Sequence, residues 1–265
     1  MHNPKISIIT ITYNSEKTLE ETVQSVISQD YPNLEYLIID GGSKDRTLDI
    51  VEKYRDKISF VISEPDRGIS DAFNKGIRYA TGEIVGIINS DDLLLPGALK
   101  TLAENYDPEV GVYRGNTIIW NDETDTKIVA RPTMTFSIYS FKRRIVCHQS
   151  TFVTKKAYEA VGTFKESFKY MMDSDLLFRL YNNDIVFRYI PSDLAVFRMG
   201  GVTNNSFWKK RTEVRRLYRE NGASRLWASI RVVHFLIYSF TAVILRKVFS
   251  PDIIRRWKFN SKKNA

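Results

Sequence analysis

The sequence contains little cysteine and lacks the motifs of two large nucleotide-binding classes. Its single cysteine, Cys147, excludes an internal disulfide framework and is typical of a reducing compartment. No Gly-x-x-x-x-Gly-Lys-[Ser/Thr] motif occurs, which excludes a phosphate-loop NTPase. No Gly-x-Gly-x-x-Gly follows the first apolar run, which argues against a dinucleotide-binding half. Internal repeats and low-complexity segments are also missing.

Long hydrophobic runs are missing as well. The first residues, MHNPKISIITITYN, follow a strand pattern without the apolar core and small-residue cleavage site of a leader, so we expect no signal peptide. Near the other end, Val232–Leu245 has fourteen residues without Lys, Arg, Asp or Glu, fewer than the ~20 that span a bilayer. The sequence therefore predicts a cytoplasmic protein without a membrane-spanning helix.

Charge is distributed unevenly along the chain. The formal net charge is +8, yet residues 207–265 contain 15 Lys and Arg against 3 Asp and Glu, a net charge of +12. The first 206 residues hold the other 24 basic and 28 acidic residues, a net charge of −4. Basic tails favour phosphate-rich partners. Aromatic residues mixed with aliphatic ones favour an anionic membrane surface over nucleic acid, while a helix packed on the body is an equal alternative.

The first hundred residues alternate apolar runs with helical patterns. Short β-branched runs predict buried strands at residues 5–12, 34–40, 58–63 and 82–89. The first intervening helix would be capped by Asn14 or Ser15 and would share one apolar face among Leu19, Val23, Val26 and Ile27. Further helices are expected around residues 48–54 and 69–80. This alternation predicts a parallel sheet with right-handed crossovers.

The pattern becomes less regular after Pro96. Two runs, at residues 110–120 and 126–132, flank the turn-like NDETD and predict antiparallel strands. A helix is expected from Asp173 to Asn183, followed by strands at residues 185–190 and 194–199. From residue 207 onward the pattern is helical, basic and aromatic.

Polar side chains follow every predicted strand of the first half. They are Tyr13 and Asn14, then Asp40, then Glu64 and Asp66, and finally Asp91 and Asp92. Ligands of open α/β sheets bind beyond these strand ends. Five carboxylates at one edge repel one another unless a cation offsets their charge, and oxygen ligands select Mg²⁺ or Mn²⁺. An Asp-Asp pair alone is more often a turn or a cap, so this prediction depends on the agreement of four strand ends.

Four motifs, SIITITYN, LEYLIIDGGSKDRT, EPDRGISDAFNKGI and ATGEIVGIINSDDLLLPGAL, resemble the family 2 glycosyltransferases of the GT-A fold, above all bacterial members that build surface polysaccharides. The resemblance is strong over Lys5–Leu99, moderate to about Gly201 and weak in the tail. It implies an α/β fold with a mostly parallel nucleotide-binding sheet, helices on both faces, and a small antiparallel acceptor-side part. Residues 1–206 would form the catalytic domain, with donor half 1–100 and acceptor half 101–206, and residues 207–265 a basic amphipathic helical tail.

The resemblance also implies donor-side roles. Ile11 and Tyr13 would line the base of a UDP- or GDP-linked sugar, and Asp40 would hold the base or ribose. Asn89, Ser90 and Asp91 occupy the family's Asp-x-Asp position, so Asp91 is the first candidate ligand of Mg²⁺ or Mn²⁺ and Asp92 the second. Asn89 adds no charge there. The arginine that the family often has after the third strand is absent, because this chain has Ala72-Phe73-Asn74. Arg67 or Lys75 would replace this phosphate-facing arginine, and Asp66 is a further donor-side candidate.

Inverting transfer needs a base that takes the proton of the acceptor hydroxyl. The resemblance places the family's catalytic aspartate at Asp173, with Asp175 second. Asp173 begins a predicted helix, where the dipole favours an anion and where an aspartate can also serve as a cap. His148 and Gln149 are acceptor-side candidates, although a lone histidine beside apolar residues is more often structural. Gly200–Gly201 would form either a plain turn or a lid over the diphosphate.

These observations together predict a metal-dependent inverting glycosyltransferase. It would add one sugar to a growing, lipid-linked saccharide at the inner face of the cell membrane. The absence of Gln-x-x-Arg-Trp argues against a processive synthase. A sugar-phosphate nucleotidyltransferase would need a glycine-rich, Arg-bearing loop where this chain has TYNSEKT. A nucleotide-sugar-binding or scaffold protein would bind donor and metal without turnover.

Overall fold

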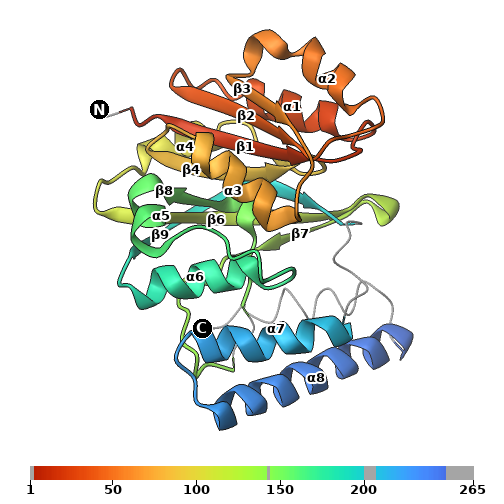
Figure 1. Cartoon of the computed structure of the whole chain (residues 1–265), viewed down its shortest axis with the longest axis vertical. Coiled ribbons are helices and arrows are strands. Elements are labelled where there is room, and N and C mark those ends of the chain that lie inside the picture. The colour runs from red at the N-terminus through yellow and green to blue at the C-terminus, as the bar shows by residue number, and fades with distance from the viewer. Residues whose placement is uncertain (1–2, 142–143, 200–206, 249–265) are drawn as a thin grey trace.

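The computed structural model describes residues 3–141, 144–199 and 207–248. These residues form a nine-stranded mixed sheet in the order β3-β2-β1-β4-β8-β6-β9-β5, with β7 paired to β6. Helices pack against both faces of the sheet, and two further helices lie across one end of the molecule (Figure 1).

The donor half has the predicted parallel arrangement. Its strands are β1 (Ile6–Thr12), β2 (Leu34–Asp40), β3 (Phe60–Ser63) and β4 (Ile84–Asn89), and β1 pairs in parallel with both β2 and β4. The connecting helices are α1 (Leu19–Ile27), α2 (Thr47–Lys53) and α3 (Ile69–Tyr79), with a short 3₁₀ turn, η1 (Arg55–Lys57), before β3. The expected strands and helices of this half are therefore confirmed.

The predicted cap of α1 is wrong. The helix begins at Leu19 after Thr18, and no side chain caps it. Asn14 instead adopts a left-handed conformation with φ of 49°, and the Ser15 carbonyl accepts from the backbone N–H groups of Thr18 and Leu19. An extra turn thus separates β1 from α1. This turn keeps the side chains that follow β1 at the edge of the sheet.

The acceptor half is a mixed sheet. Its elements are β5 (Leu93–Leu94), α4 (Ala98–Glu104), β6 (Val110–Asn121), η2 (Asp122–Thr124), β7 (Thr126–Ala130), η3 (His148–Ser150), β8 (Thr151–Thr154), α5 (Lys155–Val161), α6 (Met172–Asn182) and β9 (Val186–Arg198). The β6–β7 hairpin is antiparallel, as predicted. The two strands expected at residues 185–190 and 194–199 are one strand, β9, which runs parallel to β6 with register shifts near Asn116.

Alternating residues of the central strands fill two cores. Ile8 belongs to the core under α1 and α4, whereas Ile9 belongs to the core under α3 and α6. This alternation is the period of two that a strand buried on both faces requires. Gly76 on α3 allows close packing, because a Cβ there would lie 2.4 Å from Cγ2 of Ile9.

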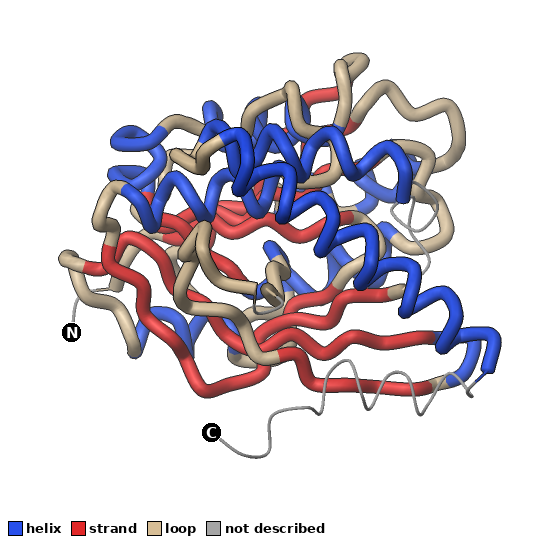
Figure 2. Tube along the Cα trace, turned by 90° about the horizontal axis from the view of Figure 1, so that it is seen from below, coloured by secondary structure: helices blue, strands red, loops and turns tan. Residues whose placement is uncertain are grey.

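The helices α7 (Phe207–Glu220) and α8 (Arg225–Val248) run side by side next to α6 (Figures 1 and 2). Val214, Leu217, Tyr218 and Ala228 belong to the same core as α3 and α6. The described part of the tail therefore packs on the body, which was one of the two expectations for it. No helix among the described residues is long and apolar enough to cross a membrane. The proposed Gly200–Gly201 lid and residues 249–265 lie outside the described residues.

Candidate active site

A pocket of about 920 Å³ lies at the carboxyl ends of the parallel strands. Side chains that follow β1 and β4 line it together with the 65–69 loop and the end of β9. Six of the residues selected from the sequence meet in this pocket: Ile11, Tyr13, Asp66, Asn89, Ser90 and Asp91. The structure thus brings three of the four predicted strand ends to one site.

Asp40 has a different place from the one expected. Its side chain is fully buried, and its carboxylate accepts from the backbone N–H groups of Gly42 and Ser43 and from the hydroxyls of Ser43 and Ser63. These bonds fold the turn that brings Gly41 to the pocket wall. The Asp40 carboxylate is not part of the pocket lining, and its contact with the base or ribose stays a prediction.

The adjacent residues Asp91 and Asp92 differ sharply. Asp92 is fully buried, and its carboxylate accepts from Gln149 Nε2 (2.7 Å), Asn89 Nδ2 (3.1 Å) and the Arg198 backbone N–H (3.0 Å). Burial, reinforced by the charge of Asp91, raises the pKa of Asp92 to about 7. Asp91 lines the pocket, and burial raises its pKa too, while the charge of Arg198 opposes that shift. Asp91 is therefore the carboxylate that a ligand in the pocket meets.

The protein itself offsets much of the negative charge at this edge. Lys75 Nζ lies 3.0 Å from Glu64 Oε1 and 2.7 Å from Asp66 Oδ1. The Arg67 guanidinium pairs with Asp71 and with Glu166. Lys75 thus offsets two of the five strand-end carboxylates, Glu64 and Asp66, whereas the partners of Arg67 are not among those five. The role of Arg67 or Lys75 toward the donor phosphates stays a prediction.

The residues suited to a divalent cation are oxygen donors at the end of β4. Among the described residues, no cluster of three or more His, Cys, Asp or Glu side chains is placed to hold a metal ion. Asp91 and Ser90 line the pocket, and Asn89 Oδ1 is buried without a hydrogen-bond partner. This set of hard oxygen ligands fits Mg²⁺ or Mn²⁺ provided that the phosphates of a donor complete the coordination.

The second chemical group is a histidine–aspartate pair. His148 Nδ1 on η3 lies 3.1 Å from Asp173 Oδ2 in the first turn of α6. Burial alone would lower the pKa of His148, but the charges of Asp173, Asp92 and Asp91 outweigh it and raise the pKa. Asp173 Oδ1 and His148 Nε2 are buried and lack a hydrogen-bond partner among the described residues. Both residues line a small cavity of about 20 Å³, and neither lines the larger pocket.

The short turn η3 joins the two parts of the site. Gln149 donates to Asp92 beneath the donor pocket, while the preceding residue, His148, contacts Asp173. Because β8 follows η3 and pairs antiparallel to β4, this turn lies at the carboxyl end of β4. Both acceptor-side candidates from the sequence thus lie next to the predicted metal position and base.

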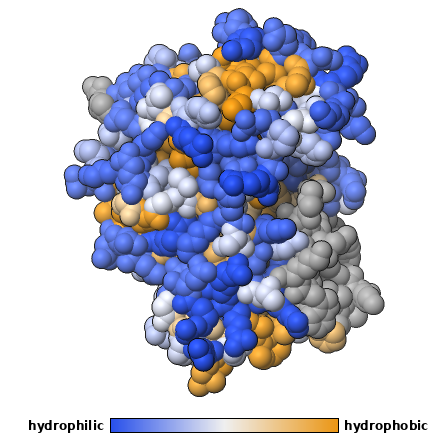
Figure 3. Space-filling view, viewed as in Figure 1, coloured by the Kyte–Doolittle hydropathy of each residue, from blue (hydrophilic) through white to orange (hydrophobic). Residues whose placement is uncertain are grey.

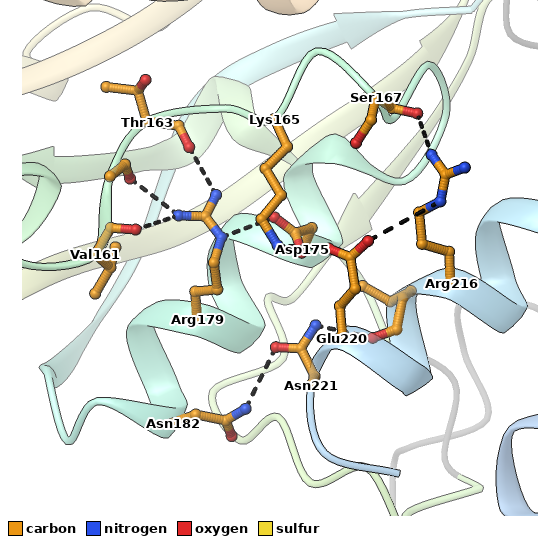
Figure 4. Close-up of polar contacts among 12 residues, drawn as sticks. Val161, Thr163, Lys165, Ser167, Asp175, Arg179, Asn182, Arg216, Glu220 and Asn221 are labelled. Atoms are coloured by element: carbon orange, nitrogen blue, oxygen red, sulfur yellow. Dashed lines mark hydrogen bonds and ion pairs between the residues drawn. The ribbon is translucent and has the colours of Figure 1, made fainter. Parts of the chain in front are cut away.

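Asp175 does not share the position of Asp173. Residues two apart on a helix point in nearly opposite directions. Asp175 is fully buried, and its carboxylate lies 2.8 Å from Arg179 Nε and 3.4 Å from Lys165 Nζ (Figure 4). The guanidinium of Arg179 also donates to the carbonyls of residues 161–163. Because the Asp175 carboxylate is buried in ion pairs with Arg179 and Lys165, its role is structural, and Asp173 is the better candidate for the base.

Arg198, at the end of β9, was missed by the sequence analysis. Its backbone N–H donates to Asp92, its guanidinium lies 2.6 Å from Glu21 Oε2, and it stacks 5.0 Å from the ring centroid of Trp120. Its Nε atom is buried without a partner among the described residues. Because β9 runs parallel to β4, the strand-end rule that selected Asp91 would also have selected Arg198.

A parallel half-sheet with a donor-sized pocket at its carboxyl edge, continued by a mixed acceptor-side sheet, is the GT-A fold. The model of glycosyl transferase family 2 matches residues 7–159, which is more than half of the sequence. The chain belongs to this family, as the sequence motifs predicted.

Related proteins agree with this assignment. An uncharacterized glycosyltransferase of Rickettsia typhi is 28% identical over 67% of this chain, and the match spans only 59% of that relative. The PGL/p-HBAD biosynthesis glycosyltransferase of Mycobacterium tuberculosis is 27% identical over 96% of this chain and 98% of its own length.

Two solved structures share the fold. S. aureus TarS in complex with UDP-GlcNAc has a TM-score of 0.65 and 23% identity, covering 88% of this chain and 71% of that one. The mannosyltransferase PcManGT from Pyrobaculum calidifontis in complex with GDP-Man and Mn²⁺ has a TM-score of 0.63 and 18% identity, covering 97% and 84%.

Proposed function

We propose that this glycosyltransferase transfers one sugar from a nucleoside-diphosphate sugar to a saccharide acceptor, with inversion and with a divalent cation. The observation that most supports this proposal is the pairing of two features at one sheet edge. Asp91 lines a large pocket, and the buried His148–Asp173 pair lies close enough for His148 to interact electrostatically with Asp91 and Asp92. The complexes of TarS with UDP-GlcNAc and of PcManGT with GDP-Man and Mn²⁺ support a donor of this class.

The donor would lie along the pocket from β1 to β4. Tyr13 and Ile11 would contact the base, and Asp66 the sugar hydroxyls of the nucleoside. Lys17, which lines the pocket, would face the diphosphate. A cation held by Asp91 with Asn89 and Ser90 would neutralise charge on the leaving diphosphate.

The base of the reaction would be Asp173. His148 holds one carboxylate oxygen, Oδ2, which leaves Oδ1 to accept the proton of the acceptor hydroxyl. The hydroxyl oxygen would then attack the anomeric carbon from the face opposite the diphosphate, which gives inversion. His148 orients the carboxylate in this scheme and does not itself take the proton.

The acceptor and the place of the reaction are inferred from the tail. We propose that the acceptor is lipid-linked and that the chain works at the inner face of the membrane in surface polysaccharide or glycolipid biosynthesis. Five apolar residues of α8 are exposed at alternating spacings of four and three: Leu226, Ile230, Val233, Ile237 and Phe240. They form one stripe along the helix, and apolar atoms are visible at the lower end of the molecule, over α8 (Figure 3).

Basic residues accompany this stripe. Arg211, Arg215 and Arg219 are exposed on α7, the helix that runs beside α8. An apolar face next to cationic side chains suits shallow insertion into an anionic membrane surface. Pairing of the stripe with a second copy of α8 is the alternative. Sedimentation with anionic vesicles distinguishes membrane binding from such a dimer.

The boundary between the catalytic domain and the tail lies further along the chain than residue 206 in our proposal. We keep the donor half at residues 1–100 and the acceptor half after it as a proposal, but α7 contributes Val214 and Leu217 to the core that contains α6. Trp227 Nε1 on α8 donates to the Ile138 carbonyl at 2.9 Å. We therefore propose that α7 and the start of α8 complete the catalytic domain and are not a separate appendage.

The proposed function is tested with a panel of UDP- and GDP-sugars incubated with Mn²⁺ or Mg²⁺. Slow hydrolysis or transfer should release nucleoside diphosphate from one donor, and a chelator should stop the release. Release of pyrophosphate from a nucleoside triphosphate and a sugar phosphate would instead identify a nucleotidyltransferase. Tight donor binding without release, with saccharide acceptors present, would identify a binding protein and would exclude the proposed catalysis.

A further inference from the structure

The segment that leads into α6 is held by one buried carboxylate from another helix. Glu213 on α7 accepts from three successive backbone N–H groups: Lys169 (2.9 Å), Tyr170 (2.8 Å) and Met171 (3.0 Å). Successive N–H groups that converge in this way form an anion-binding concavity, and the N-terminus of a helix adds favourable dipole potential. Glu213 is 8% exposed, so these bonds compensate much of the cost of its burial.

The helix has no cap of its own at this point. The residue at the N-cap position is Met171, and no side chain caps the helix there. Helix N-termini usually obtain such bonds from a Ser, Thr, Asp or Asn side chain at that position. Here the acceptor comes from more than forty residues later in the sequence, so α6 takes its starting position from α7.

The same face of α7 holds the rest of the loop before α6. Arg216 Nη1 donates to the Ser167 carbonyl at 2.9 Å, and Glu220 Oε2 lies 2.6 Å from Lys165 Nζ (Figure 4). Residues 213, 216 and 220 lie on one side of a helix because they are three and four residues apart. Three side chains of α7 therefore contact the segment 165–171 along its length.

Asp173 follows this segment directly. It lies two residues after Met171, and its Oδ2 contacts His148 at 3.1 Å. A shift of about 1 Å in a reacting group can lower a rate by about 10²-fold. We propose that Glu213 is a positioning residue that fixes the orientation of Asp173, so that docking of α7 sets the geometry of the base. This inference rests on the proposed role of Asp173.

The test compares Glu213→Gln and Glu213→Asp with Glu159→Gln, which removes an exposed carboxylate from α5. Turnover is measured as nucleoside diphosphate released from the UDP- or GDP-sugar selected in the donor screen. Glu213→Gln should lower kcat on the order of 10²-fold with little change in donor KM, because the donor pocket is untouched. Glu213→Asp keeps the charge but shortens the side chain, so its kcat should lie between that of the wild type and that of Glu213→Gln. The kcat of Glu159→Gln should match wild type.

The effect of Glu213 must also depend on Asp173. In an Asp173→Asn background, Glu213→Gln should lower the remaining rate no further, since the group that it positions is gone. An equal loss in both backgrounds, or a loss that appears in donor KM, would show general disturbance and overturn the inference. If Glu213→Gln does not fold, a wild-type kcat in Glu213→Asp overturns it.

The same data separate this inference from the proposed function. Normal turnover in Asp173→Asn would reject Asp173 as the base. Normal turnover in Glu213→Gln beside an inactive Asp173→Asn would reject only the role of Glu213.

Discussion

The two ends of the parallel sheet use their charged residues in opposite ways. At the amino end, Glu35 accepts from Lys5 Nζ, Ser7 Oγ and both the N–H and the hydroxyl of Thr81. At the carboxyl end, Asn89 Oδ1, His148 Nε2 and Asp173 Oδ1 are buried without partners among the described residues. Buried polar atoms are nearly always paired, and each exception needs an explanation. Glu35 thus has all its partners within the protein at the amino end, whereas three buried polar atoms at the carboxyl end have none among the described residues.

We infer from this difference that fully paired charges serve the fold, and that charges facing the pocket serve the proposed reaction. A carboxylate with all its bonds to the protein stabilises the native state, and its loss should reduce stability at unchanged chemistry. A carboxylate that faces a pocket costs stability, and its loss should remove activity while the fold remains. The predictions below test this division, starting with the largest expected effect.

Asp173→Asn should have the largest effect on catalysis. The amide keeps the shape of the side chain but cannot take the proton of the acceptor, so kcat should fall by about 10²- to 10⁴-fold. Donor affinity, measured by calorimetry with the nucleoside diphosphate, should stay within about twofold. Asp175→Asn is the control for stability. It weakens the buried ion pair with Arg179, so its main effect should be a lower melting temperature. If Asp173→Asn turns over normally, the base lies elsewhere.

The donor half was predictable because its elements and its site residues are close together in the sequence. Each apolar run ends directly in the polar residues that face the pocket, so β4 and Asp91 come from one continuous motif. What the sequence could not show is which carboxylates the fold would bury. Asp40 and Asp92 look equivalent to Asp91 in the sequence, and only the tertiary contacts from Ser63, Gln149 and Arg198 distinguish them.

Asp91→Ala should have the second largest effect. Removal of the carboxylate that faces the pocket should lower kcat/KM by about 10²-fold and weaken the response to Mn²⁺ or Mg²⁺. The melting temperature without donor should change little, because the Asp91 carboxylate accepts from its own backbone N–H and, among the described residues, forms no hydrogen bond or ion pair with another residue. Ser90→Ala, its neighbour, should lose much less activity. Full activity of Asp91→Ala in the presence of chelator would exclude the metal assignment.

The acceptor half was predicted less well because its contacts are distant in the sequence. The helix at Asp173 and the His148–Gln149 motif were found, but their meeting point depends on η3 and α6 packing together. The pairing of β9 with β6 joins segments about 76 residues apart, and no local pattern encodes such a register. The backbone N–H groups of residues 169–171 likewise donate to a distant residue, Glu213 on α7. The sequence of the tail therefore could not predict these hydrogen bonds.

Two acidic substitutions on α8 should have a moderate effect on location and little on chemistry. Val233→Glu with Ile237→Glu places two charges in the exposed apolar stripe, and sedimentation with anionic vesicles should weaken on the order of tenfold. Lys156→Glu, on α5, changes the net charge by the same two units and should bind normally. Wild-type binding should also weaken in high salt.

Point substitutions are preferable here to truncation at Arg225. Ala228 and Arg231 are buried, so removal of α8 would open the core. Equal binding of the wild type to neutral and anionic vesicles would remove the electrostatic part of the proposal. A concentration-dependent dimer that the two α8 substitutions dissociate, without vesicle binding, would assign the stripe to a second copy of the chain.

Glu35→Gln should have the smallest effect on activity and a clear effect on stability. Burial alone would raise the pKa of Glu35, but hydrogen bonds from Lys5, Ser7 and Thr81 outweigh it and lower the pKa to about 2. A carboxyl group whose pKa is lower in the folded state stabilises the protein above its unfolded pKa, near 4.5, and loses that contribution as pH falls toward 2.

The wild type should therefore exceed Glu35→Gln in unfolding free energy by about 2–3 kcal/mol at pH 7, and the difference should shrink steadily below about pH 4. Glu104→Gln, which changes an exposed carboxylate on α4, should show a small difference at every pH. The kcat of Glu35→Gln at pH 7 should equal that of the wild type, because Glu35 lies at the end of the sheet opposite the pocket. Denaturant titrations between pH 3 and pH 7 measure the difference in unfolding free energy between the wild type and Glu35→Gln. A constant difference across that range, or a loss of kcat without loss of stability, would contradict the division between the two ends of the sheet.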